Sequence, residues 1–121
     1  MRDYKKEYEE RVAFIRNLLE KSGAKGIVYG NSGGKDSALV GILCKAACDN
    51  TVGIIMPCAS KRNFGQDAED ARIAADQYGI ETRFIDLTPV REAEMQQLSS
   101  LTEVTPAAVV NIAPRLRMTT L

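Results

Sequence analysis

The sequence predicts an α/β fold of three layers, in which a parallel sheet lies between helices, and three observations lead to it. A helical pattern comes first, and a strand followed by a helix then occurs three times. The first two strand patterns are short and continuously apolar, which is typical of strands buried on both faces. A loop of small residues joins the first strand directly to its helix. This alternation favours right-handed crossovers, with helices on both faces of the sheet.

The first third of the chain contains two helical patterns and one strand. Apolar side chains recur every three to four residues over 4–21, which predicts an amphipathic helix that ends at Ser22 and Gly23. Residues 26–30 are expected to form the first strand. Residues 37–48 are apolar nearly all round, so we expect a helix that is covered on most sides.

The middle of the chain contains the second strand and its helix. Residues 52–56 predict another buried strand, which Pro57 closes. A face of small apolar residues predicts a helix over 65–78 that ends at Gly79. Four polar residues near its start complement the helix dipole, and we interpret them in that structural sense. They are Gln66, Asp67, Glu69 and Asp70.

The third strand is expected over residues 82–87. Thr88 then has the character of an N-cap, and Pro89 suits the first turn of a helix. We therefore expect a short helix through about Leu98, followed by a loop over residues 99–110.

The final residues have helical character. Asn111 would be a good N-cap, and Pro114 would then fall in the first turn, where its missing N–H costs nothing. Leu116, Met118 and Leu121 are apolar, and no residue that ends a helix follows them. We expect this exposed stripe, together with an uncovered sheet edge, to make the chain associate with itself.

Composition and charge argue against a disordered chain and against a protein that binds nucleic acid or an anionic membrane. The chain has 121 residues, of which 45% are hydrophobic and 26% are charged, as in an ordinary globular domain. Sixteen basic residues balance sixteen acidic ones, so we expect no nucleic acid and no anionic membrane as a partner. The three cysteines and the polar start of the chain indicate reduced thiols and a cytoplasmic protein. We expect residues 1–121 to form one domain.

The loop after the first strand carries the chemistry. Gly30, Gly33 and Gly34 allow the backbone to turn back so that its N–H groups converge on a ligand. Converging N–H groups at a helix start attract phosphate, and Ser32 and Ser37 add hydroxyl donors. The predicted ligand is a nucleotide polyphosphate.

Asp36 stands in the same loop and indicates a cation. A carboxylate beside a bound polyphosphate is repulsive unless a cation lies between them, so we interpret Asp36 as a ligand for Mg²⁺. Two better-known phosphate loops do not fit. A Walker loop would need Gly where Tyr29 stands, and the dinucleotide fingerprint G-x-G-x-x-G is absent.

The segment Ser-Gly-Gly-Lys-Asp-Ser over 32–37 resembles the loop of the ATP pyrophosphatase (PP-loop) superfamily. Together with Ile55-Met56-Pro57 and Asn-Ile-Ala-Pro-Arg-Leu-Arg-Met over 111–118, it resembles NAD synthetase, which amidates deamido-NAD with ATP and ammonia through an adenylated intermediate. The resemblance implies an adenine nucleotide α-hydrolase-like fold, incomplete here. We expect a domain truncated at its C-terminal end.

The same resemblance implies the site residues. The ATP-binding residues would be Gly30, Asn31, Ser32, Gly33, Gly34, Lys35, Asp36 and Ser37, with Met56 offering its backbone to adenine. Asp36 would take part in binding Mg²⁺. Arg115 would contact deamido-NAD, whereas Arg117 is open between a binding role and a solvated helix charge. The residues identify no catalytic group.

The resemblance also implies the partners and the open alternatives. Deamido-NAD and ammonia, free or derived from glutamine, would be substrates, and a homodimer is expected. NAD synthetases are about twice as long and carry further ATP and metal contacts, so we expect this chain to be inactive alone. A non-catalytic ATP-binding or assembly module remains an alternative, as does another PP-loop enzyme that amidates or thiolates a different acceptor.

Overall fold

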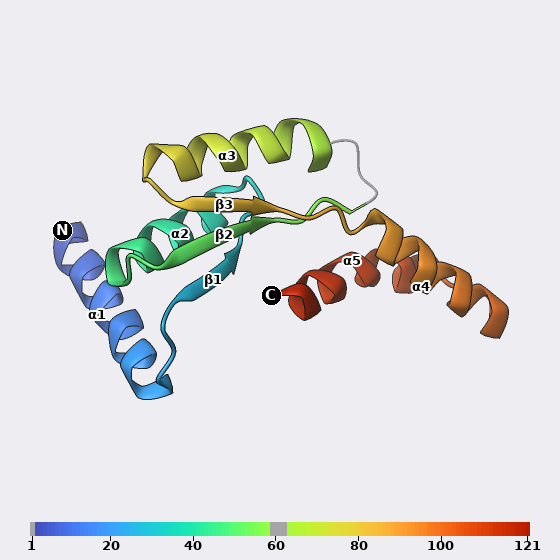
Figure 1. Ribbon diagram of the computed structural model, residues 1–121, viewed down its shortest axis with the longest axis horizontal. Helices are drawn as coiled ribbons and strands as arrows, with labels where there is room; N and C mark the ends of the chain where they lie inside the picture. The colour runs from blue at the N-terminus through green and yellow to red at the C-terminus, as the bar shows by residue number, and fades with distance from the viewer. Residues whose placement is uncertain (1, 59–62) are drawn as a thin grey trace.

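The computed structural model describes residues 2–58 and 63–121 and contains a parallel sheet with helices packed against it (Figure 1). The elements in chain order are α1 (Tyr4–Ser22), β1 (Ile27–Gly30), α2 (Lys35–Ala47), β2 (Thr51–Ile55), the π-helical turn η1 (Asn63–Asp67), α3 (Ala68–Gln77), β3 (Glu81–Phe84), α4 (Thr88–Leu101) and α5 (Pro106–Thr120). Within the described residues, no helix combines the length and hydrophobicity needed to cross a membrane.

The three strands lie in the order β1-β2-β3 and all run in parallel, as the alternation predicts. Ile27 pairs with Thr51, and Val52 pairs with Glu81. When successive crossovers of one hand move in the same direction across a sheet, their helices lie on the same face. The contacts agree, because α2 packs on β1 and β2, α3 packs on β2 and β3, and the two helices touch.

Small residues let α2 approach the sheet around Tyr29. A side chain at Gly41 of α2 or at Gly53 of β2 would collide with the Tyr29 ring, which is buried. Tyr29 forms one buried cluster with Ala75 of α3 and Ile80. Burial raises the pKa of the Tyr29 phenol above its ordinary value, and it also raises the pKa of the Cys44 thiol on α2.

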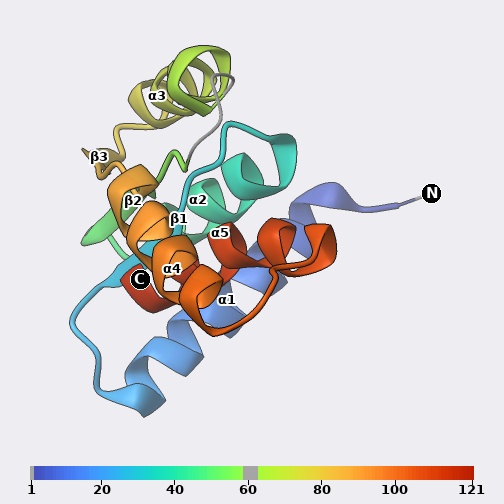
Figure 2. The same ribbon diagram turned by 90° about the vertical axis from the view of Figure 1, so that its right-hand side faces the viewer.

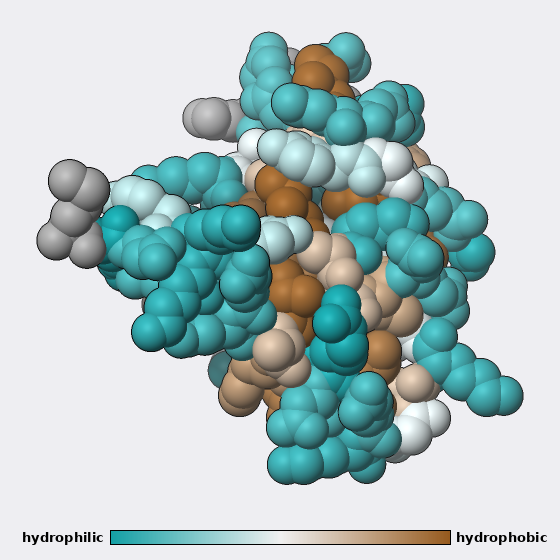
Figure 3. All heavy atoms as spheres, turned by 90° about the vertical axis from the view of Figure 1, so that its left-hand side faces the viewer, coloured by the Kyte–Doolittle hydropathy of each residue, from teal (hydrophilic) through white to brown (hydrophobic). Residues whose placement is uncertain are grey.

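The opposite face of the sheet meets α5. Because side chains alternate along a strand, Ile54 points away from α2 and α3. Ile54 and, from α5, Ala113 and Leu116 pack against a buried cluster on this side. That cluster is Met56, Cys58 and Leu87. Farther along this face, Val28 remains 52% exposed. Viewed from the side on which α1 lies in Figure 1, apolar surface gathers in the middle, within a hydrophilic rim (Figure 3).

The start of the last helix differs from the sequence prediction. The expected loop over 99–110 is reduced to residues 102–105, and α5 begins at Pro106, with the Thr105 hydroxyl accepting the Ala108 N–H at 3.2 Å. Thr105 and Pro106 supply the cap and the first-turn proline that we had expected from Asn111 and Pro114. Pro114 therefore lies inside the helix. Figure 2 shows α4 and α5 folded side by side.

Three smaller expectations are also corrected. The third strand ends at Phe84 rather than at residue 87. Thr88 is the first residue of α4, and Leu87 stands at the cap position. The Asp86 carboxylate accepts the Thr88 N–H at 2.9 Å. The apolar stripe expected at the end of the chain is divided, because Leu116 is half-buried against the core whereas Met118 is 79% exposed.

Candidate functional site

The glycine-rich loop lies between the end of β1 and the first turn of α2. Gly34 is the N-cap of α2, so the helix starts at Lys35, two residues earlier than predicted. The first N–H groups of a helix have no partner within the helix, and they carry the positive end of its dipole. The loop therefore has the local geometry of an anion site.

Two serine hydroxyls bridge this loop internally. The Ser37 hydroxyl donates to the Gly34 carbonyl at 3.1 Å and accepts the Ser32 N–H at 3.2 Å. Since that leaves Ser37 no second proton, Ser32 is the donor across the 3.1 Å between the two hydroxyl oxygens. Ser32 Oγ in turn accepts the Gly34 N–H at 3.3 Å. These bonds are long, so a phosphate oxygen can replace them at little cost.

Asn31 anchors the loop to the rest of the fold. Its side chain is only 3% exposed, and its Nδ2 donates to the Ala71 carbonyl of α3 at 3.0 Å. Its backbone N–H donates to the Ile54 carbonyl of β2 at 2.9 Å, and its Oδ1 accepts the Gly33 N–H at 3.4 Å. One buried residue therefore connects the loop to a strand and to a helix.

Gly33 is required by its conformation and by its neighbour. Its φ of +88° lies in the left-handed region, which favours glycine. A Cβ at this position would lie 3.2 Å from Asp67 Cα and closer still to the Asp67 carbonyl oxygen. The start of α3 is thus packed directly on the loop.

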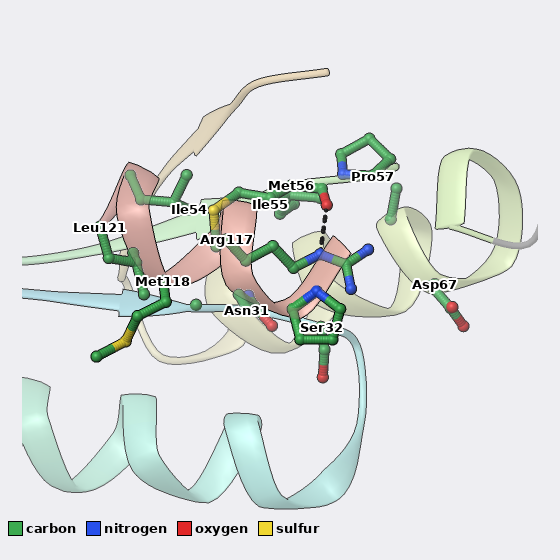
Figure 4. Close-up of a pocket in the computed structure, with 13 residues that line it drawn as sticks. Asn31, Ser32, Ile54, Ile55, Met56, Pro57, Asp67, Arg117, Met118 and Leu121 are labelled. Carbon is green, nitrogen blue, oxygen red and sulfur yellow. Dashed lines mark hydrogen bonds between the residues drawn. The ribbon is translucent and has the colours of Figure 1, made fainter. Parts of the chain in front are cut away.

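A pocket of about 370 Å³ opens where the carboxyl ends of β1 and β2 meet α3 and α5 (Figure 4). Its volume is that of a small-molecule site. Leu121 and Met118 stand at one end, and Asp67 stands at the other. The lining residues are Gly30, Asn31, Ser32, Ile54, Ile55, Met56, Pro57, Asp67, Ala68, Pro114, Arg117, Met118 and Leu121.

The two arginines of α5 lie in different surroundings. Arg117 is half-buried, lines the pocket and donates from Nε to the Met56 carbonyl at 2.9 Å. Arg115 is exposed and is not among the lining residues. Gly30 leaves room for this wall, because a Cβ there would meet Leu121 Cδ1 at 3.7 Å and Met56 Cε at 3.3 Å.

Asp36 and Lys35 are exposed in the first turn of α2, beside the loop. Among the residues that the structure describes, no group of three or more His, Cys, Asp or Glu side chains is arranged to hold a metal ion. Mg²⁺ in nucleotide sites commonly takes one or two carboxylates together with phosphate oxygens and water. The exposed carboxylate of Asp36 beside the glycine-rich loop fits that donor set.

The family model for NAD synthase matches residues 7–121, which is nearly the whole chain. The chain belongs to the NAD synthase family. It is 37% identical over 122 residues to an NH(3)-dependent NAD(+) synthetase from Carboxydothermus hydrogenoformans and 39% identical over 120 residues to one from Finegoldia magna. Each match covers 98% of this chain but only 49% and 48% of the relative. The chain thus spans about half the length of these NAD synthetase relatives.

Solved structures of the family share the fold. An NH3-dependent NAD synthetase from Campylobacter jejuni, in complex with a nitrate ion, matches with a TM-score of 0.85 and 32% identity over 99% of this chain and 51% of its own. A glutamine-dependent NAD+ synthetase from Acinetobacter baumannii, in complex with ADP, matches at 0.87 and 26% over 100% of this chain and 23% of its own. The resemblance and the adenine nucleotide α-hydrolase-like fold are confirmed.

The structure brings Gly30, Asn31 and Ser32 of the predicted loop to one pocket with Met56. The rest of the loop, residues 33–37, lies beside the pocket without lining it, and Arg115 lies outside. The structure also adds wall residues that sequence reasoning did not assign, among them Asp67 and Arg117. The sequence indicates for Asp67 only a partner of the helix dipole. Its position at the start of a helix that follows a parallel strand was an available signal, because such helix starts face the carboxyl edge of the sheet.

Proposed function

We propose that this chain binds Mg²⁺-ATP as the nucleotide-binding part of an NAD synthetase-type ligase. The observation that carries the proposal is the loop of residues 30–37, in which N–H groups, two hydroxyls and the start of α2 converge beside a pocket. In the reaction, a carboxylate oxygen of deamido-NAD attacks the α-phosphorus of ATP and pyrophosphate leaves. Ammonia then displaces AMP and forms the amide of NAD.

The loop would hold the triphosphate. Phosphate oxygens would replace the long internal bonds of Ser32 and Ser37 and accept from the backbone N–H groups of Gly33, Gly34 and Lys35. Asn31 would keep the loop in this conformation. Lys35 adds a positive charge on the same turn. These donors act by position and charge, which is how sites for phosphoryl and nucleotidyl transfer stabilise developing charge.

Asp36 would hold Mg²⁺ beside the phosphates. When bound, the ion neutralises phosphate charge during the attack on the α-phosphorus. The role of this chain is to place one carboxylate next to the loop, at the positive end of α2, where its charge is stabilised.

The pocket would take the adenine ring. Its walls are largely apolar side chains with few polar groups, as is common for nucleobase sites. The backbone of Met56, at the end of β2, would offer hydrogen bonds to the edge of the base. The ADP complex of the Acinetobacter baumannii relative supports an adenine nucleotide as ligand of this fold.

The second substrate and the assembly form part of the same proposal. Arg115, exposed on α5, would bind deamido-NAD through its planar fork of donors. The names of two relatives favour free ammonia over glutamine as the nitrogen source. We further propose that residues 1–121 act as one nucleotide-binding domain in a homodimer. We also propose a cytoplasmic location, which the three free thiols favour.

The difference in length between this chain and its relatives bears on whether the chain can catalyse the reaction alone. Because the chain spans about half of them, we propose that it binds ATP but does not complete the ligase reaction alone. A non-catalytic ATP-binding module is the second candidate function. The two candidates share the nucleotide site and differ in whether an acceptor is ever adenylated.

Calorimetric titration with ATP tests the site. We expect wild-type affinity to rise when Mg²⁺ is present, and we expect Asp36→Asn to lose that rise, about a factor of ten or more for one charged contact. Asp49→Asn is the matched control, because Asp49 is exposed and lies beyond the far end of α2. Equal Mg²⁺ dependence in wild type and Asp36→Asn would remove Asp36 from the site.

A further inference from the structure

We propose that Arg117 is a positioning residue for the base pocket: it holds the wall formed by α5 against the end of β2. The inference rests on the proposed function, because it concerns the ATP site described above. It assigns to Arg117 a role in base binding, separate from phosphate binding by the loop.

The first support is the hydrogen bond between α5 and β2. Arg117 Nε donates to the Met56 carbonyl at 2.9 Å and so joins residues that are 61 positions apart in the chain (Figure 4). Arg117 is half-buried, and Met56 is only 7% exposed. A partly buried bond from a cationic donor is stronger than a typical surface bond. The bond fixes the same backbone segment that would face the base.

The second support is the face of α5 on which Arg117 lies. Pro114, Arg117, Met118 and Leu121 all line the pocket. Their spacing of three, four and seven residues places them on one side of the helix. A contact that fixes the position of Arg117 therefore fixes the position of the whole wall.

Pro114 makes this tertiary bond more important. A proline inside a helix has no N–H to donate to the carbonyl four residues earlier, so the helix is weakened at that turn. The turns that follow Pro114 are those that face the pocket. Their position depends more on contacts outside the helix, and the Arg117–Met56 bond is one of these.

The wall and the phosphate loop are separate parts of the site. Met56, Pro57 and the residues of α5 line the apolar part of the pocket, which only Gly30, Asn31 and Ser32 of the loop also reach. The hydroxyls and N–H groups of residues 32–37 would surround the phosphates. Loosening α5 should weaken contacts to the base and leave the loop unchanged. The affinity for ATP should then fall while the affinity for a bare polyphosphate does not.

The test is a calorimetric comparison of two ligands, Mg²⁺-ATP and Mg²⁺-tripolyphosphate. Arg117→Met keeps most of the apolar stem and removes the donors. We expect the loss of the bond to Met56 to lower the affinity for ATP about tenfold and to leave tripolyphosphate affinity within about twofold. Arg11→Met is the control for lost charge, because Arg11 is exposed on α1 and bonds only within its own helix in the described structure.

A second variant distinguishes the loss of the Arg117–Met56 bond from a general loss of folding. Arg117→Lys keeps the charge and the stem but lacks Nε and the planar fork, so it should show the same separation between the two ligands. Unchanged ATP affinity in both variants would overturn the inference. An equal fall for ATP and tripolyphosphate would also overturn it, because Arg117 would then contact phosphate or support the entire fold. A wild-type chain that binds neither ligand would contradict the proposed function, and the inference with it.

Discussion

Replacing Gly33 by alanine tests how the loop is built. The backbone at Gly33 has a φ of +88°, which costs a residue with a Cβ about 1–2 kcal/mol. The new methyl group would also overlap the carbonyl of Asp67, and such overpacking costs about 1–3 kcal/mol more. We therefore expect Gly33→Ala to lower the free energy of unfolding by about 2–5 kcal/mol.

Gly79→Ala is the matched control. Gly79 has a similar φ of +66°, but a Cβ there would meet no atom within 4 Å. It should therefore show only the backbone cost of about 1–2 kcal/mol. The difference between the two variants measures the contact between the loop and the start of α3.

Urea unfolding followed by circular dichroism gives both values under one set of conditions. The affinity for Mg²⁺-ATP, measured on the folded fraction, should fall for Gly33→Ala and stay at the wild-type value for Gly79→Ala. If the two variants were destabilised equally, the close packing of Gly33 on Asp67 would be refuted.

Three further outcomes are expected. Burial raises the pKa of Tyr29 above the value near 10 that it has in the unfolded chain, so the stability that the neutral phenol contributes is lost as the pH rises through the folded pKa. Tyr29→Phe should therefore lose less stability between about pH 8 and about pH 11 than Tyr78→Phe, which keeps Tyr29. Light scattering should show self-association that Phe14→Lys with Leu18→Lys reduces, because both side chains are more than half exposed on α1; a monomeric wild type would contradict this. Pyrophosphate release with ATP, deamido-NAD and ammonia should stay at background for the chain alone, and turnover that Asp36→Asn abolishes would disprove that expectation.

The sheet and the loop could be predicted because their signals are local. Short apolar runs predict the buried strands β1 and β2, and glycines beside Ser32 and Ser37 predict the turn into α2. The predicted start of α5 was wrong because two segments carry the same start signals. Thr105-Pro106 and Asn111-Pro114 each offer a cap and a proline. The structure uses the first pair, with the Thr105 hydroxyl accepting the Ala108 N–H and the longer helix packed along α4.

The walls of the pocket could not be predicted from local signals. Arg117 meets Met56 across 61 positions of sequence, and whether an arginine on a helix is solvated or buried depends on that contact. The same holds for Leu121, which the sequence alone places in an exposed stripe. It remains 48% exposed in the structure, but its side chain lies beside Gly30, where the absence of a side chain leaves room. Long-range packing therefore decides which residues of α5 face the pocket.

The central claim is that Mg²⁺-ATP binds at the loop after β1, and amide chemical shifts measured during an ATP titration test it most directly. With Mg²⁺ present, we predict that the largest shifts fall on Gly33, Gly34 and Lys35, with a second group at Met56 and Arg117. Mg²⁺-tripolyphosphate should move the first group alone. Shifts concentrated elsewhere, or none at all at ATP concentrations that saturate related sites, would contradict the account.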